Sequence, residues 1–454
     1  MALKISRILH AGYAFECGDT KIAFDPVFEN PFSRNCHAFP NVQFDLEQIR
    51  QIRFDAVFIS HFHDDHCSLE SLDLLDRKTP IYLYCVFEEL FSLIRELGFI
   101  NVHSLKLDTP IQIGALEIIP RRALDAEVDS LFQVKVSGLN VLNVVDSWID
   151  DATLNQLVDL GPWDLVLWPF QTMLETDVLA PSRAPVAIRE LPSEWLEQIK
   201  ALNPKYIVPS ACQFIQEPWS WYNQRMFPIT YQQFQKEIES ALPQTQVVRL
   251  NPSRSFVLDK NSLHASPGLS WVQPVGNQEL DFEYDASLQP TPTSEIAQHF
   301  EALTAEQTEY VLEYCRSGLI QKYRSLDAPS EIYFDKPRVW SLSVFDHTGD
   351  VQTFLYKVKC ENIERVGDTN DRPSWTTEIP VAKLYAALEL GESLTSLYMR
   401  INDVVFEPAI EKEIQYADIV EDPLIRCLFN GDFGSYQKAQ LKRIKARANE
   451  LSKS

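Results

Sequence analysis

The sequence lacks long apolar runs, paired cysteine motifs and an excess of positive charge. Its most apolar stretches, such as residues 55–60 and 139–145, have the length of strands, whereas a membrane-spanning helix needs about 20 apolar residues. The eight cysteines include no CxxC pair, which argues against a zinc ribbon, an iron–sulfur cluster or a disulfide scaffold. Lys and Arg number 41 against 64 Asp and Glu, and the net charge of −23 disfavours nucleic acid and anionic membranes as partners.

The amino-terminal residues also lack the features of a secretory signal. They show the charges and alternation of a first strand, without a hydrophobic block or a small-residue cleavage site. We therefore expect a cytoplasmic protein with reduced cysteines. With 454 residues, 45% of them hydrophobic, the chain is long enough for two or three globular domains.

The sequence divides into three regions by pattern. Residues 1–258 alternate short β-rich runs with helical segments, which predicts a layered α/β domain. Residues 259–300 are rich in Pro, Ser, Gly and Asn without a sustained period, which is typical of a linker. Residues 301–454 predict an α+β accessory domain with the following elements: helix 304–324, strands 338–347 and 351–366, helix 381–390, strand 397–406 and a basic helix 435–451. We expect this last helix to present a solvated face, because the rest of the chain is acidic.

A dense cluster of potential metal ligands follows the run at residues 55–60. The chain has only nine histidines, yet four potential ligands fall within six residues: His61, His63, Asp65 and His66. A strand that ends in such a turn can direct imidazole and carboxylate groups into one space, a donor set that suits zinc, iron or manganese. This spacing predicts a dinuclear site, with the first two histidines at one metal and the Asp65–His66 pair at the other.

The pattern His61-x-His63-x-Asp65-His66 resembles the signature of the metallo-β-lactamase superfamily. The resemblance implies an α/β fold, an αββα sandwich with the metal site at one sheet edge. Asp25-Pro26 resembles the turn that closes a strand beside the site, and Asp146, after the run LNVLNVV, stands where the family has an aspartate that bridges both metals. A buried carboxylate between two cations is physically reasonable, because the cations offset its desolvation. The resemblance makes Asp65 and Asp146 the predicted catalytic carboxylates.

Two histidines of the family pattern have no counterpart in this sequence. Most members have one about a hairpin before the bridging aspartate and another after a later strand. In the first gap we rank Asp129 first as the replacement metal ligand, since it immediately precedes the strand-like LFQVKV, and Glu127 second. The alternative is that these acids form a solvated loop or pair with Arg121 and Arg122. In the second gap Cys212 is either a thiolate ligand or a buried core residue.

Two segments narrow the resemblance. VDSLFQVKVSGLNVLNVVDSW and VPSACQF are similar to the CMP-N-acetylneuraminate hydroxylase-like branch, which replaces these histidines and carries a further domain. Residues 378–403 resemble the tail of that branch and a sterol-carrier-like fold. The branch usually has a Rieske cluster, whose Cys and His ligands this sequence lacks. Hydroxylation would therefore require a separate electron donor.

These observations leave two enzymatic hypotheses and one that is not enzymatic. With two divalent metal ions, iron or zinc with manganese as an option, the site would hydrolyse a small-molecule ester, phosphoester or amide through a metal-bound hydroxide. Carboxylates in place of imidazoles shift the preference towards iron, so the alternative is a di-iron oxygenase or oxidase that acts on a small molecule. The third hypothesis is a scaffold that has lost catalysis, which the intact ligand cluster disfavours.

Aromatic residues in QEPWSWYNQRMF suggest a substrate-binding wall. It would comprise three rings and one guanidinium, suited to a flat or sugar-like anionic molecule: Trp219, Trp221, Tyr222 and Arg225. Alternatively, the tryptophans pack the second domain against the first. Tyr13 and His10, at the end of the first strand, either line the mouth of the site or lie in the strand's core.

Overall fold

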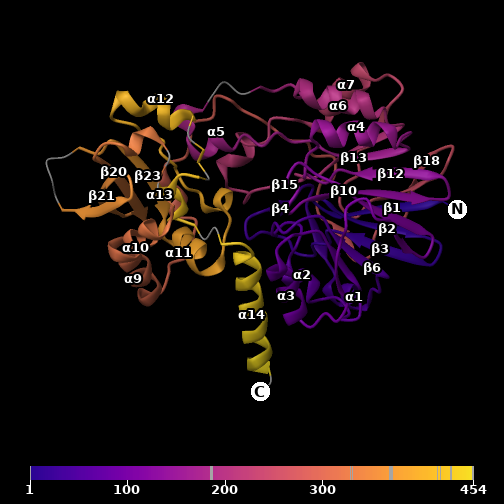
Figure 1. The fold of residues 1–454 in the computed structure, drawn as a ribbon, viewed down its shortest axis with the longest axis horizontal. Coiled ribbons are helices and arrows are strands. Elements are labelled where there is room, and N and C mark those ends of the chain that lie inside the picture. Colours follow the sequence, from indigo (N-terminus) through magenta and orange to yellow (C-terminus); the bar gives the residue numbers. More distant parts are fainter. Residues whose placement is uncertain are drawn as a thin grey trace.

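The computed structural model describes residues 2–184, 188–327, 329, 331–367, 372–416, 418–419, 421–429 and 432–451. Two bodies of secondary structure lie side by side (Figure 1). The larger, coloured indigo to magenta, contains two packed sheets, and the smaller, coloured orange to yellow, contains one. The α/β sandwich expected for the first part of the chain is confirmed.

The first sheet brings the amino-terminal hairpins next to parallel strands. Strand β6 consists of four buried apolar residues and pairs in parallel with β3 and β7, so its end points towards one edge of the sheet. In sheet order the strands are β18 (Leu263–Ser266), β17 (Ser255–Leu258), β1 (Leu3–Leu9), β2 (Gly12–Cys17), β3 (Thr20–Phe24), β6 (Ala56–Ile59), β7 (Ile81–Leu83) and β8 (Val102–Ser104).

The second sheet packs face to face on the first. Its strands are, in order, β16 (Gln246–Val247), β14 (Tyr206–Ser210), β13 (Leu165–Pro169), β12 (Leu139–Asn143), β11 (Ser130–Val136), β10 (Leu116–Arg122) and β9 (Ile111–Ile113). The core between the sheets is aromatic: the ring of Phe132 on β11 lies 5.0 Å from that of Phe24 on β3 and 5.9 Å from that of Phe58 on β6. Such contacts bury large apolar areas and hold the strand ends of both sheets together.

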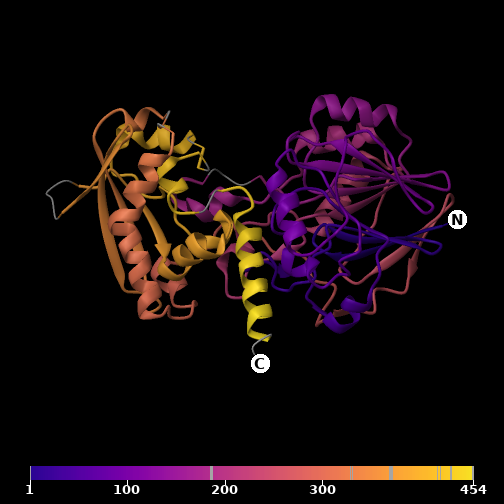
Figure 2. The ribbon, with the colours of Figure 1, turned by 60° about the horizontal axis from the view of Figure 1, so that its bottom comes forward.

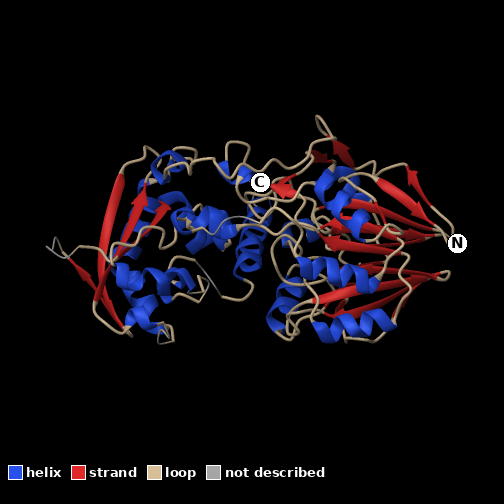
Figure 3. Cartoon of the chain, turned by 90° about the horizontal axis from the view of Figure 1, so that it is seen from above, coloured by secondary structure: helices blue, strands red, loops and turns tan. Residues whose placement is uncertain are grey.

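Helices cover both outer faces, which completes the four layers (Figure 3). On the first sheet's side lie α1 (Leu46–Gln51), α2 (Leu69–Leu72) and α3 (Glu88–Glu96); on the other side lie α4 (Asp151–Asp159), α6 (Ser193–Leu202) and α7 (Tyr231–Ala241), with α5 (Glu175–Leu179) towards the smaller body. Local sequence explains where several helices begin: the side chains of Asp45, Asp150 and Thr230 cap α1, α4 and α7. The side chain of Ser68 caps α2 in the same way.

Part of the segment predicted as a linker has regular structure. Strand β18 pairs with β17 at the edge of the first sheet, and β19 (Val272–Pro274) pairs with β5 (Val42–Phe44). A second ribbon joins β15 (Phe214–Ile215) to β4 (His37–Ala38). These strands could not be predicted from the sequence, because each is only a few residues long and depends on a distant partner for its hydrogen bonds. The domain limits at 258 and 300 stay predictions.

The smaller body contains a four-stranded sheet flanked by helices. Its strands are, in order, β22 (Asn362–Val366), β21 (Val351–Lys359), β20 (Arg338–Phe345) and β23 (Trp375–Pro380); its helices are α8 (Thr293–Ala297), α9 (Ala305–Glu313), α10 (Leu319–Ser325), α11 (Val381–Leu390), α12 (Pro408–Tyr416), α13 (Pro423–Arg426) and α14 (Ser435–Leu451). The predicted α+β arrangement is confirmed, and its sterol-carrier-like resemblance stays a prediction.

The strand predicted over residues 397–406 is wrong. This segment forms isolated bridges to β23, one at Glu378 and Arg400 and one at Trp375 and Val405. Asn402 between these bridges has a φ of +49°, which turns the backbone out of the extended conformation that its apolar alternation suggested.

The basic terminal helix has the expected solvated face, since residues 445–450 and the side chains of Lys438 and Lys442 are exposed, but its other face is docked. In both views α14 lies between the two bodies (Figure 2). It forms ion pairs with acidic residues of α2 and α3: Lys438–Glu89, Arg443–Glu70, Lys445–Glu96 and Arg447–Glu70. Positive charge is therefore concentrated on this helix because its docking surface is acidic. In the described part of the chain, every helix is too short or too polar to cross a membrane.

Candidate metal centre

Three strand ends meet at one edge of the sandwich. The residues that follow β1, β6 and β12 bring His10, the His61–His66 turn and Asp146 into one space. The backbone there is unusual, because His10, Asp25 and Val145 have φ values of +50°, +41° and +61°. Positive φ is costly for such side chains, most of all for a β-branched valine, and residues strained in this way cluster at functional sites.

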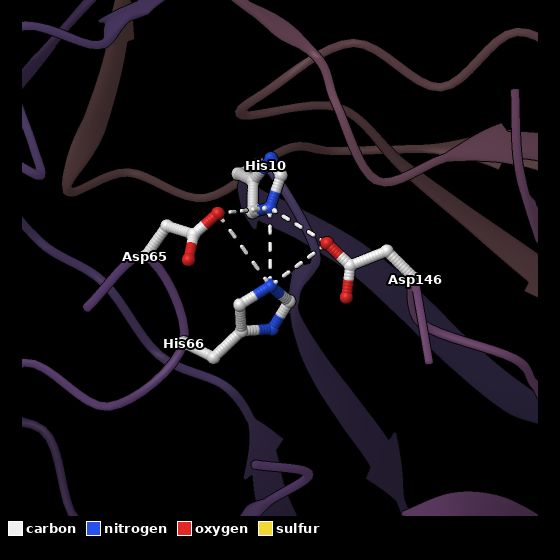
Figure 4. A group of neighbouring side chains, drawn as sticks. All are labelled: His10, Asp65, His66 and Asp146. Carbon is white, nitrogen blue, oxygen red and sulfur yellow. Dashed lines mark hydrogen bonds and ion pairs between the residues drawn. The ribbon is translucent and has the colours of Figure 1, made fainter. Parts of the chain in front are cut away.

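The first ligand group comprises four side chains whose donor atoms all lie within 4.8 Å of one another: His10, Asp65, His66 and Asp146 (Figure 4). The Nε2 atom of His66 lies 3.2 Å from that of His10 and 3.1 Å from Oδ2 of Asp146. The Nε2 atom of His10 lies 3.1 Å from Oδ2 of Asp65. Two imidazoles and two carboxylates directed at a common point match the donor set of a divalent transition metal.

A second group lies on the other side of Asp146. The Nε2 atom of His61 is 3.0 Å from Nδ1 of His63 and 3.7 Å from Oδ1 of Asp146. This Oδ1 atom is buried without a hydrogen-bond partner among the described residues. A buried carboxylate oxygen without a partner is costly, and a cation between it and the two imidazoles would satisfy it. The two oxygens of Asp146 thus face two separate groups, as a bridging ligand requires.

Buried polar residues fix the orientation of two of these histidines. Asp25 accepts hydrogen bonds from the backbone and hydroxyl of Ser60, both at 2.7 Å, and its Oδ2 lies 3.1 Å from Nδ1 of His66. The Ser60 hydroxyl also lies 2.9 Å from Nδ1 of His61. Both histidines therefore have Nδ1 engaged and Nε2 directed at the centre, the arrangement that second-shell partners give metal-binding imidazoles. Asp25 has this role because the Asp25-Pro26 turn places it beside the end of β6.

The backbone of His10 is held by a buried arginine. Arg7 donates from Nε and Nη2 to the carbonyl of His10, at 2.9 and 2.5 Å, and from Nη1 to the carbonyls of Pro209 and Leu250. These bonds give the buried guanidinium polar partners and tie the two sheets together at the site. They also stabilise the left-handed conformation that turns His10 into the centre.

The electrostatics of the centre favour positive charge. Burial would raise the pKa of Asp146, but His66 and hydrogen bonds from His10 and His66 hold it well below its ordinary range. Burial would lower the pKa of His66, but the carboxylates of Asp146 and Asp65 raise it well above its ordinary value. Burial and the neighbouring His66 and His63 lower the pKa of His61, so that His61 is neutral, the form that binds metals. A metal ion at the centre would supply the positive charge that these carboxylates favour.

The predicted replacement ligand Asp129 lies next to the centre but outside the group of four. It is half-buried just before β11, whose first residue, Ser130, donates its backbone N–H to the carbonyl of Ser60 at 3.1 Å. Burial and the charges of Asp146 and Asp125 raise the pKa of Asp129 to about 7. Its charge is therefore destabilised where a cation would stabilise it, and its role as a ligand stays a prediction.

The other two alternatives are less favourable. Glu127 is exposed, and its backbone carbonyl accepts a hydrogen bond from Val86. Cys212 is buried, and burial together with the charge of Asp146 raises the pKa of its thiol well above the ordinary value. A protonated, buried thiol fits the reading of Cys212 as a core residue.

The residues predicted to form a substrate-binding wall all contact other residues of the protein. Trp219 stacks on His299 with ring centroids 4.0 Å apart, and Tyr222 lies 4.7 Å from Tyr398. Trp221 packs under Arg400 at 5.6 Å, whereas Arg225 pairs with the buried Asp177 at 3.1 Å. The three rings thus join the larger body to the smaller one, the alternative that the sequence left open. A role in substrate binding stays a prediction for all four residues.

His10 is the member of the centre that sequence reasoning did not assign. From its position after the first strand, His10 is expected either at the mouth of the site or in the strand's core; the structure places it in the centre, fully buried with its Nε2 among the carboxylates. A signal was present: the ligand set lacked two histidines, and His10 follows the first strand at the edge where the other ligands gather. The contact with His66 could not be predicted, because 56 residues separate the two histidines in the sequence.

The two packed sheets and the cluster of potential ligands at their edge are similar to known proteins over part of the chain. Residues 4–211 match the family model described as the beta-lactamase superfamily domain. A curated relative, the cytidine monophosphate-N-acetylneuraminic acid hydroxylase of Danio rerio, is 28% identical over 155 residues, which cover 32% of this chain and 26% of the relative. The chain thus spans about a quarter of that relative's length.

Two solved structures have similar folds over part of the chain. Igni18, a metallo hydrolase of Ignicoccus hospitalis, aligns at 17% identity with a TM-score of 0.40, over 57% of this chain and 99% of that one. CmlA, a diiron beta-hydroxylase of Streptomyces venezuelae, aligns at 16% identity with a TM-score of 0.39, over 57% of this chain and 53% of that one.

Proposed function

We propose that this chain is a dinuclear metalloenzyme that hydrolyses a small-molecule ester, phosphoester or amide. The observation that carries the proposal is the position of Asp146, whose Oδ2 lies 3.1 Å from His66 and whose unpartnered Oδ1 lies 3.7 Å from His61. One carboxylate between two imidazole groups is suited to bridge two cations. Two divalent ions there would lower the pKa of a bound water and provide hydroxide as the nucleophile.

The residues present fit two metal ions. His61 and His63 would hold the first, and His10, Asp65 and His66 would hold the second, with Asp146 shared. Asp129 is the proposed further ligand, because a cation would offset the repulsion between its charge and that of Asp146. Asp25 and Ser60 keep the Nδ1 atoms engaged, so each ring presents Nε2 without reorganisation. Asp65, partly exposed beside His10, is the proposed catalytic carboxylate because it would lie at the second metal, next to the bound water.

A second candidate is a di-iron oxygenase or oxidase. Two observations favour it: the carboxylates in the donor set, which suit iron, and the 28% identity over 155 residues to a relative named as a hydroxylase. His10 weakens the first observation, because it adds an imidazole to a donor set whose carboxylates favour iron. This candidate also needs a separate electron donor as a partner. In either case we propose a small-molecule substrate, a place in the cytoplasm and iron or zinc as the metal.

Metal analysis followed by two assays separates the candidates. The protein is purified without added metal, its metal content is measured, and it is then loaded anaerobically with iron or with zinc. Turnover of a panel of phosphoesters, lactones and amides by the zinc form, without oxygen uptake by the iron form, would support hydrolysis. Oxygen consumption by the iron form on exposure to air, with no hydrolysis in either form, would overturn it in favour of the oxygenase. Failure to retain either metal would refute both.

A further inference from the structure

The docked helix α14 reaches the metal-binding turn itself. Two glutamines one helical turn apart point from α14 into the larger body, and both are buried, with Gln437 1% and Gln440 0% exposed. Phe433, just before the helix, packs on Phe62 with ring centroids 4.4 Å apart. The last helix of the smaller body thus contacts the turn that carries the ligands, although more than 360 residues separate the two in sequence.

Gln437 bonds to both ends of this turn. Its Nε2 atom donates to the carbonyl of Phe62 at 2.6 Å and to the carbonyl of Cys67 at 2.9 Å. The first carbonyl directly precedes His63, and the second directly follows His66. One amide group therefore uses both of its hydrogens to hold the two ends of the ligand-bearing stretch at a fixed separation. Within the turn, the amides of His66 and Cys67 both donate to the carbonyl of His63, at 3.1 and 2.8 Å.

We propose that Gln437 is a positioning residue of the metal centre, acting through the backbone of the turn. Removal of its amide would leave two buried carbonyls without these donors, and the turn would shift to satisfy them. His63, Asp65 and His66 lie on the stretch that would shift, so their donor atoms would no longer converge. The proposal rests on the proposed metal centre and extends it: the larger body does not hold its metals at full affinity without the carboxyl-terminal helix.

Gln440 provides a matched comparison. It is equally buried and also makes two hydrogen bonds, accepting from the backbone of Leu69 at 2.7 Å and donating to the Ser68 hydroxyl at 2.9 Å. Those partners belong to the start of α2, after the last ligand. Gln437→Met and Gln440→Met therefore remove the same chemical group from the same face of the same helix, and only the first releases the ends of the turn.

The test compares these variants in the full chain. Zinc affinity is measured by competition with a chromophoric chelator, and amide hydrogen exchange is followed in the metal-free protein. We expect Gln437→Met to weaken zinc binding by about 10-fold to 100-fold, the loss typical of outer-shell substitutions, and to accelerate exchange at His66 and Cys67. Gln440→Met should leave both unchanged, although it lowers the unfolding temperature to a similar extent. If Gln437→Met does not fold, Gln437→Asn, which keeps a shortened amide, takes its place.

The outcomes separate this inference from the proposed function. Equal zinc affinity in both variants, whether both fall or neither does, would overturn the role of Gln437, because a purely structural contact predicts that result. A wild-type protein that binds no zinc or iron would refute the proposed function. Amide exchange would then decide whether Gln437 holds the turn: unchanged exchange at His66 and Cys67 would overturn the inference as well.

Discussion

Asp25→Asn is the substitution that tests the orientation of the centre most precisely. The wild-type carboxylate is fully buried and accepts from the backbone and hydroxyl of Ser60 while its Oδ2 contacts Nδ1 of His66 at 3.1 Å. An asparagine has the same shape, and its oxygen can still accept from the Ser60 backbone. Its amide group would then face Nδ1 of His66 as a donor, which would move the imidazole proton to Nε2. That atom is the one directed at Asp146 and His10, so it would no longer be free to bind a metal.

The expected loss is about 10-fold to 100-fold in affinity for the metal at His66, the range found for outer-shell partners, equivalent to about 1.4–2.7 kcal/mol. The assay is a zinc titration against a chromophoric chelator, with thermal unfolding of the metal-free protein as a check on folding. Asp55→Asn is the control, since Asp55 precedes β6, the strand that Ser60 follows, but accepts an exposed hydrogen bond from the backbone of Lys21. Unchanged affinity in a folded Asp25→Asn protein would refute the proposed orientation of His66.

Further substitutions test the ligands one group at a time. Joint replacement of His61 and His63 by alanine should remove one of two metal ions, as measured by elemental analysis, and full retention would contradict their assignment. Asp129→Ala should weaken metal binding whereas Asp125→Ala should not, and the reverse result would move the ligand to Asp125. The raised pKa of Asp129, about 7 against an ordinary 3.8, means that the folded metal-free protein binds a proton more tightly than the unfolded chain does. The free energy of unfolding should therefore fall as pH rises from about 4 to 7. Asp129→Asn should reduce that fall by about 1 kcal/mol, as measured by chemical denaturation. An identical pH profile in the variant would show that the charges of Asp146 and Asp125 do not repel Asp129.

The layered fold was predictable because it depends on local patterns. Buried strands such as β6 appear in the sequence as short apolar runs, and α11 occupies the predicted residues 381–390. The turn that carries the ligands was equally predictable from the sequence, since four potential donors lie within six residues. Asp146 required the family resemblance, because nothing local distinguishes it from other aspartates after a strand.

The parts that could not be predicted depend on contacts distant in sequence. His10 meets His66 across 56 residues, and Gln437 meets Phe62 across 375. The docking of the basic helix α14 was not predicted, because its acidic partners on α2 and α3 cannot be located from composition. Similarly, the aromatic residues after β15 indicated a ligand wall, because their stacking partners at His299 and Tyr398 lie in another part of the chain.

We infer that Asp146 is shared by two metal ions, and the number of ions bound per chain tests this inference. Elemental analysis of the full chain, loaded with zinc or iron and then freed of loosely bound metal, should give about two ions per chain. Asp146→Ala should reduce this value to well below one, because both groups lose the same carboxylate, whereas loss of His61 and His63 should leave about one. A wild-type protein that holds a single ion, or an Asp146→Ala protein that keeps two, would contradict the account.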